Sequence, residues 1–221
     1  MSIKLTGATS GSIEIDVPDA VSGGDISLTL PNGVGSAGQV LKNSSTAGTL
    51  EFANGGKILQ VEQTVNTSRA SITATSTYTT IPNFTVSITP SSSSSKILVL
   101  VQLSASSAGN YAGANLRLAR TIGATTDNTI YYGDAAGSRY RATIAFTPPQ
   151  FYVDATYGPG VATINYLDSP STTSAVTYGL QFQDDSGSAD ILYLNAATAY
   201  STDSADHGTL ASSIIAMEVA S

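Results

Sequence analysis

Three glycines in the N-terminal quarter of the chain have the spacing of a phosphate-binding loop. In LPNGVGSAGQVL, residues 30–41, Gly33, Gly35 and Gly38 form a GxGxxG pattern after an apparent strand, as in dinucleotide-binding loops. In those loops the pyrophosphate lies on the N-terminus of a helix that follows the glycines directly. Here only QVLK follows before the turn residues NSSTAG, which leaves no room for a helix and a crossover. We therefore predict turn structure at these glycines and no bound cofactor.

Two acidic clusters contain metal-ligand chemistry without a complete ligand set. His207, the only histidine, lies beside Asp203 and Asp206, so one imidazole and two carboxylates could hold a metal ion. The Gly-rich context and the lack of a second histidine favour a solvated turn. DDSGSAD, residues 184–190, is similar to a calcium loop but lacks the alternating ligand spacing and the closing Glu. We expect a hairpin turn there and no metal site in either cluster.

Catalytic groups are equally incomplete. One histidine would have to serve any nucleophile triad, and no GxSxG elbow is present. The chain has no cysteine, which excludes thiolate catalysis, disulfides and Cys metal sites. Paired carboxylates that cleave a glycoside are the alternative that the sequence leaves open. We expect a protein that is not an enzyme.

One cluster combines the side chains that suit recognition of a sugar or a protein. In TIYYGDAAGSRYRA, residues 129–142, it consists of Tyr131, Tyr132, Arg139, Tyr140 and Arg141, around a Gly-rich turn. Tyrosine offers a flat apolar face and a hydroxyl, and arginine offers a planar set of donors. The same side chains could instead pair across strands, with arginine covering the rings. We favour this structural interpretation and keep the five residues as candidates for surface contact with a ligand or partner.

Composition narrows the classes of partner. The 221-residue chain has a net charge of −7, and only 11% of its residues are charged. Binding to nucleic acid requires clustered Lys and Arg, so we expect no nucleic-acid partner. The longest apolar run, Ile97–Val101, is too short to insert into a membrane. No apolar signal peptide is visible at the N-terminus, and we expect synthesis in the cytoplasm without one.

Patterns of period two dominate the chain and predict β-strands. In residues 12–17, 25–30 and 177–183, apolar residues alternate with polar ones, as in strands with one buried face. KILVLVQL, residues 96–103, is apolar on both faces and predicts a central strand. The five-serine run Ser91–Ser95 predicts a loop. Short strands separated by Gly- and Ser-rich turns indicate an all-β sandwich or barrel.

The chain has two compositional zones. Residues 1–56 have short strands, many glycines and no large aromatic residue except Phe52, whereas residues 57–221 have longer strands and regularly spaced aromatic residues. About 55 residues with so few large side chains are near the limit of independent folding. The glycines of Ala53–Gly56 suit a linker. We therefore expect two domains, of which the first needs a partner surface, either the second zone or other copies of itself.

Residues 28–53, LTLPNGVGSAGQVLKNSSTAGTLEFA, resemble a segment of structural proteins of tailed bacteriophages, especially tail-fibre-like proteins of cyanobacterial phages. The shared pattern is Leu-Pro at the end of a short strand, a Gly-rich turn, Gly-Gln-Val-Leu, a polar turn, and a strand that ends in an aromatic residue and Ala. Here it predicts a hairpin of Gln39–Lys42 and Thr49–Ala53, joined by a turn at Asn43–Gly48. VSITPSSSSSKILVLVQLSAS and the final IIAMEVA are similar to the β head that often follows.

The resemblance implies a homotrimeric virion structural protein. Residues 1–56 would be an attachment and trimerising β segment, and residues 57–221 an antiparallel, jelly-roll-like β-sandwich head. The protein would lie on the virion surface. Its N-terminal segment would bind other virion proteins of the tail or capsid.

Four hypotheses remain open at this point. A tail fibre would use the head to bind a host cell-surface glycan, whereas a capsid decoration or head-fibre protein would bind the capsid through residues 1–56. A carbohydrate-binding module would bind a glycan tightly as a monomer. A glycan-degrading enzyme would release reducing ends from host polysaccharide.

Overall fold

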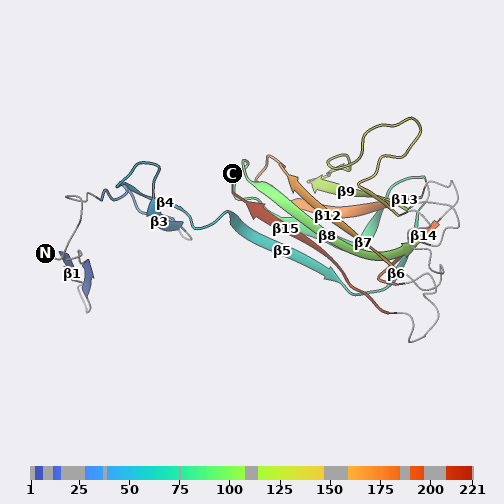
Figure 1. Ribbon diagram of the computed structural model, residues 1–221, viewed down its shortest axis with the longest axis horizontal. Coiled ribbons are helices and arrows are strands. Elements are labelled where there is room, and N and C mark those ends of the chain that lie inside the picture. Colours follow the sequence, from blue (N-terminus) through green and yellow to red (C-terminus); the bar gives the residue numbers. More distant parts are fainter. Residues whose placement is uncertain are drawn as a thin grey trace. The chain divides into compact units, whose positions relative to one another are not determined.

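The computed structural model describes residues 3–6, 12–15, 28–36, 39–74, 76–107, 114–146, 159–184, 190–196 and 208–220. Every regular element in these ranges is a β-strand, so the all-β prediction is confirmed (Figure 1). A membrane-crossing helix is not found in this part of the chain. His207 and residues 185–189 of the second acidic cluster lie outside the described residues. The chain divides into two compact units, Met1–Gly55 and Gly56–Ser221.

The strands of the first unit are β1 (Ile3–Thr6), β2 (Ser12–Ile15), β3 (Gln39–Asn43) and β4 (Leu50–Asn54). Those of the second unit, the head, are β5 (Ile58–Asn66), β6 (Ala70–Ala74), β7 (Thr79–Ile88), β8 (Lys96–Ser107), β9 (Ala114–Ile122), β10 (Thr125–Asp127), β11 (Ile144–Phe146), β12 (Gly160–Asp168), β13 (Val176–Asp184), β14 (Asp190–Leu194) and β15 (Ser212–Val219).

The first unit contains two antiparallel pairs, β1–β2 and β3–β4. The predicted hairpin is therefore confirmed, with Val40 opposite Ala53 and Leu41 opposite Phe52. A third extended segment was not predicted to join it. Thr29 forms a parallel bridge with Thr49, in which its N–H donates to the Gly48 carbonyl at 2.7 Å and its carbonyl accepts from the Leu50 N–H at 2.8 Å.

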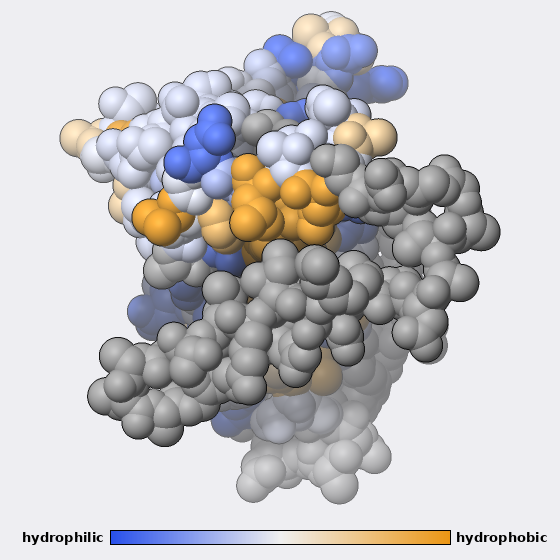
Figure 2. Space-filling model, turned by 90° about the vertical axis from the view of Figure 1, so that its left-hand side faces the viewer, coloured by the Kyte–Doolittle hydropathy of each residue, from blue (hydrophilic) through white to orange (hydrophobic). Residues whose placement is uncertain are grey.

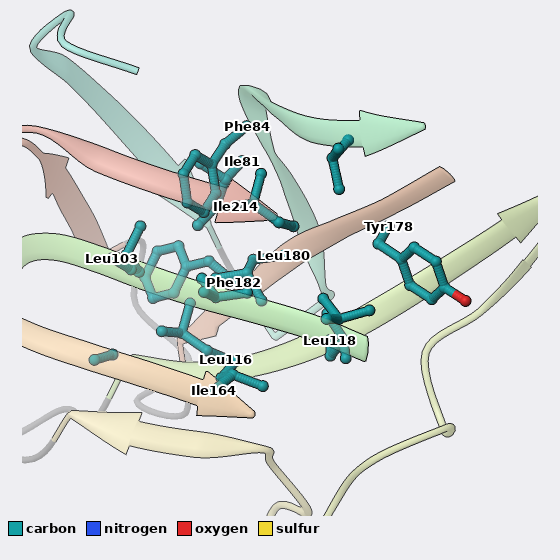
Figure 3. Close-up of a cluster of buried hydrophobic side chains, with 14 of the residues drawn as sticks. Ile81, Phe84, Leu103, Leu116, Leu118, Ile164, Tyr178, Leu180, Phe182 and Ile214 are labelled. Atoms are coloured by element: carbon teal, nitrogen blue, oxygen red, sulfur yellow. The ribbon is translucent and has the colours of Figure 1, made fainter. Parts of the chain in front are cut away.

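The head consists of two antiparallel sheets. One has the order β10-β9-β13-β7, with β11 also pairing with β9; the other has the order β5-β15-β8-β14-β6, with β12 pairing with the second edge of β8. Inward-facing side chains of both sheets form one core (Figure 3). The predicted inward residues of β13, Tyr178, Leu180 and Phe182, are all fully buried, because alternation along a half-buried strand fixes which side chains face the core.

β8 is the central strand that the sequence predicts. It pairs with β12 on one edge and with β15 and β14 on the other. Its inward residues, among them Val99, are buried, but the alternate residues Leu98 and Leu100 remain partly exposed on the outer face of the sheet. β8 is therefore apolar on both faces, although only its inner face is fully buried within one chain.

The five serines form a loop between β7 and β8, as predicted, and two of them, Ser91 and Ser95, hydrogen-bond to a buried carboxylate. Glu218 of β15 is 1% exposed. Its Oε1 accepts from the Ser91 N–H at 2.7 Å and the Ser91 hydroxyl at 2.6 Å, and its Oε2 accepts from Gln60 Nε2 at 2.6 Å. Burial raises the pKa of Glu218, but hydrogen bonds from Ser91, Ser95 and Gln60 outweigh burial, so the net pKa is lowered.

This lowered pKa predicts a dependence of head stability on pH. In the unfolded chain a Glu carboxyl titrates at about 4.3. Because the folded pKa lies lower, Glu218 contributes stability above that pH and loses it as the pH falls through the folded pKa. We expect the urea midpoint to fall more steeply below about pH 4 in the wild type than in Glu218→Gln. Equal slopes for the two proteins between pH 5 and 3 would contradict the prediction.

Candidate partner-binding surfaces

The glycine-rich loop of residues 30–36 packs on an aromatic ring of its own unit. A Cβ atom on Gly35 would lie 2.6 Å from Cδ1 of Phe52, closer than real side chains approach, so only glycine fits there. Nothing lies within 4 Å of the same position on Gly33, and Gly38 lies outside the described residues. Gly35 thus lets the loop lie directly on the Phe52 ring.

One face of the small sheet formed by residues 28–30, β4 and β3 is apolar. The pairing of Leu41 with Phe52 and of Thr29 with Thr49 places five side chains on this face. They are Leu28, Leu30, Leu41, Leu50 and Phe52, which we call the 28–52 apolar face. Leu28 is 58% exposed, Leu30 64% and Leu41 47%. The described part of this unit therefore leaves most of its large apolar side chains in contact with water.

The opposite face of the same sheet carries its charged side chains, together with Val40 and Ala53. Lys42 and Glu51 form a cross-strand ion pair at 3.4 Å, with both side chains about half exposed, and Thr29 and Thr49 lie on the same side. Such an exposed pair contributes little to stability. The unit therefore has one face with the charged side chains and one apolar face, which its own described residues cover only in part, where the glycine-rich loop packs on Phe52.

The predicted tyrosine–arginine cluster lies in the long loop between β10 and β11, which is held against β9. The Thr143 N–H donates to the Leu116 carbonyl at 2.8 Å, and Arg117 Nε donates to the Arg141 carbonyl at 2.7 Å. Within the loop, the Gly133 N–H donates to the Ala142 carbonyl at 3.1 Å. The loop therefore positions its side chains through backbone contacts with a core strand.

Two of the five predicted residues are brought together in a stack of rings and guanidinium groups. The Arg141 guanidinium lies 3.7 Å from the centre of the Tyr132 ring, and Arg117 lies 5.2 Å from that ring and 4.2 Å from the Tyr78 ring. Such contacts stabilise the fold. For Tyr132 and Arg141 the geometry agrees with arginine covering the rings. Burial raises the pKa of Tyr78, although the Arg117 guanidinium acts in the opposite direction.

The remaining predicted residues do not join this stack. Tyr131 stacks on Tyr166 of β12, with ring centres 4.8 Å apart and planes at 13°, and stays 42% exposed. Tyr140 is 47% exposed, and Arg139 is exposed in a turn in which its N–H donates to the Ala136 carbonyl. Binding of a ligand or partner by Tyr131, Arg139 and Tyr140 stays a prediction.

Sequence reasoning missed three members of this cluster: Tyr78, Arg117 and Tyr166. Each lies far along the chain from the loop. Arg117 sits between the buried Leu116 and Leu118 in β9, and its outward position follows from the period-two pattern. Its ring partners do not follow from that pattern, because they come from other strands and loops.

No group of three or more His, Cys, Asp and Glu side chains that could hold a metal ion is found among the described residues. Apart from the residues drawn in grey, Figure 2 shows mainly pale and blue residues of weak to strong polarity, with hydrophobic groups mostly gathered in a compact orange area. No protein-family model matches the sequence, and no curated protein matches it.

Proposed function

We propose that this chain is a non-enzymatic structural subunit of a tailed-phage virion, a homotrimeric appendage that is anchored through residues 1–56 and displays the head. The observation that carries the proposal is the 28–52 apolar face, within the segment that resembles phage tail-fibre proteins. Exposed apolar surface of this kind marks a site of protein association. Because the surrounding residues are mostly uncharged, a partner can cover it at a low cost of desolvation.

Association of three copies around one axis suits the apolar side chains of the 28–52 apolar face. Covering a half-exposed Leu or Phe contributes about 1 kcal/mol at 25 cal/mol per Å², so the five side chains together support a specific contact between copies. The ion pair of Lys42 and Glu51 stays on the opposite face, where water can solvate it. Three copies can therefore bury the apolar faces around one axis without burying a charge.

We also propose that the head is a jelly roll, the double-sheet arrangement of eight strands found in viral capsid proteins. Support comes from the strand order, in which β5-β15-β8-β12 forms one group of four and β7-β13-β9-β11 the other. Along the chain these eight strands alternate between the two sheets, except for the step from β9 to β11. This alternation is what two interleaved Greek keys require.

The mass of the full chain in solution tests the trimer. We expect light scattering at micromolar concentration to give three chain masses for the wild type. We expect Leu41→Glu to weaken association at least 100-fold, because a carboxylate would be buried in the interface.

Val40→Glu is the matched control. Val40 is the neighbouring residue, is 45% exposed against 47% for Leu41, and lies on the opposite face of the hairpin. A monomeric mass for the wild type, or equal effects of the two substitutions, would contradict the proposal. Imaging of the particle with labelled protein then distinguishes tail from capsid placement.

A further inference from the structure

Apolar side chains form a continuous row across the outer face of the six-stranded sheet of the head. The register places Val61 of β5 opposite Met217 of β15, Met217 opposite Leu98 of β8, and Leu98 opposite Leu167 of β12. Figure 1 shows β5, β15 and β8 running side by side. Val61 is 53% exposed and Leu167 47%, while Leu98 and Met217 are partly exposed. We call these four residues the outer apolar row.

Neighbouring positions extend the row on both sides. Leu100 lies opposite Ile215 in the next register position, and Ile58, which is 55% exposed, pairs with Val219 after a bulge. Together the eight side chains expose on the order of 400 Å², which is as large as the patches that mark interaction sites on monomers. A free-standing interface needs about 800 Å² per partner. The area therefore suits a contact between molecules that are already held together.

The charge on this face favours a copy of the same chain as the partner. Among the outward positions of β5, β15, β8 and β12, only Lys96 at the beginning of β8 is charged, although the chain carries a net charge of −7. In a symmetric assembly each copy brings the same charges, and like charges in contact are costly. An uncharged face avoids that cost.

The chain connection brings such copies together. β4 ends at Asn54 and β5 begins at Ile58, and the four Cα steps between them span at most about 14 Å. If the N-terminal units form a trimer, three heads are tethered with the beginnings of β5 close to one axis. A short tether of this kind produces an effective concentration in the millimolar range, at which a small apolar contact forms.

We propose that the outer apolar row is the contact between neighbouring heads in the trimer. Its β5–β15 side, with Val61 and Met217, packs on the β8–β12 side, with Leu98 and Leu167, of the next copy. Because the two sides differ, the contact is head-to-tail and closes after three copies. The inference rests on the proposed trimer and adds the surface through which the heads meet.

Cysteine cross-linking in the full chain tests this contact. The protein has no cysteine, so Val61→Cys combined with Leu167→Cys introduces the only thiols. Within one copy, β5 and β12 are three strand spacings apart, about 14 Å, whereas a disulfide needs Cα atoms within about 7 Å. We expect mild oxidation of the double variant to form a covalent trimer on a non-reducing gel, at least tenfold above either single variant.

The matched control combines Val61→Cys with Val161→Cys. Val161 lies on the same face of β12, six residues from Leu167, and is 56% exposed. We expect little covalent trimer from this pair. A protein that has three chain masses but does not cross-link through residues 61 and 167, or cross-links equally through 61 and 161, overturns this inference and leaves the proposed function standing. A monomeric mass overturns both.

Discussion

Replacing Asn195 by alanine is expected to lower the free energy of unfolding of the head by about 4 kcal/mol. Asn195 is fully buried after β14. Its Nδ2 donates to the Asn66 carbonyl at 2.8 Å and the Ser68 carbonyl at 3.0 Å, and its Oδ1 accepts from the Ser212 hydroxyl at 2.6 Å. The Ser212 hydroxyl in turn accepts from the Ser104 N–H at 2.9 Å. One amide thus joins the beginning of β15, the interior of β8 and the end of β5.

The expected loss of stability in Asn195→Ala comes from polar groups that would lose their hydrogen-bond partner. Alanine would leave two carbonyls and one hydroxyl without the partner that Asn195 supplies, and each unsatisfied buried group costs about 1–3 kcal/mol. The backbone of Asn195 also has φ of 55°, which asparagine tolerates better than alanine does.

Asn83→Ala separates the two contributions. Asn83 has φ of 54° but is exposed, so its replacement reports the backbone cost of exchanging asparagine for alanine, which we expect to be about 1 kcal/mol or less. Urea unfolding of both variants and the wild type measures the difference. A loss below 1 kcal/mol for Asn195→Ala would show that the amide does not hold these strands together.

Replacing Arg120 by methionine is expected to lower the free energy of unfolding by about 3 kcal/mol. Arg120 Nη1 of β9 lies 2.9 Å from Asp168 Oδ1 and 3.0 Å from Oδ2, and Asp168 of β12 is 3% exposed. The Tyr178 hydroxyl, which points away from the apolar cluster in Figure 3, donates to Asp168 Oδ2 at 2.7 Å. Burial and this hydrogen bond raise the pKa of Tyr178, so its hydroxyl stays protonated.

Arg120→Met is expected to destabilise the head because methionine leaves the buried Asp168 carboxylate without its counter-charge. Two controls test this explanation. Asp127 also contacts Arg120, at 3.5 Å, but its side chain is 40% exposed, so Asp127→Asn is expected to cost less than about 1 kcal/mol. Arg120→Met combined with Asp168→Leu removes both charges and is expected to recover part of the loss. A double variant that is less stable than Arg120→Met alone would contradict the explanation.

Local patterns predicted much of the fold. The hairpin of β3 and β4 followed from turn residues between two short strands, and the inward face of β13 followed from strict alternation. In IIAMEVA the pattern is ambiguous, because every position except Glu218 is apolar or small. The structure buries that carboxylate and exposes part of Met217. The sequence of β15 alone does not reveal that the distant serine loop, residues 91–95, supplies hydrogen bonds to Glu218.

The candidate surfaces, too, were predicted only in part from the sequence. The sequence placed Tyr132 and Arg141 in a cluster of five residues and favoured arginine covering the rings, but it did not identify Arg117, which lies over the Tyr132 ring. Proximity of residues far apart in the chain depends on strand order, and many strand orders are compatible with the same alternation.

By itself, the sequence of this protein determined the all-β class and the hairpin of the first unit, and it predicted an N-terminal segment near the limit of independent folding. These properties depend on turn chemistry and on the period of side chains along one strand, and both act over a few residues. Only the tertiary structure decided which apolar side chains stay in water. The outer apolar row exists because four strands with different positions in the chain pair in one register, and register is set by contacts between strands.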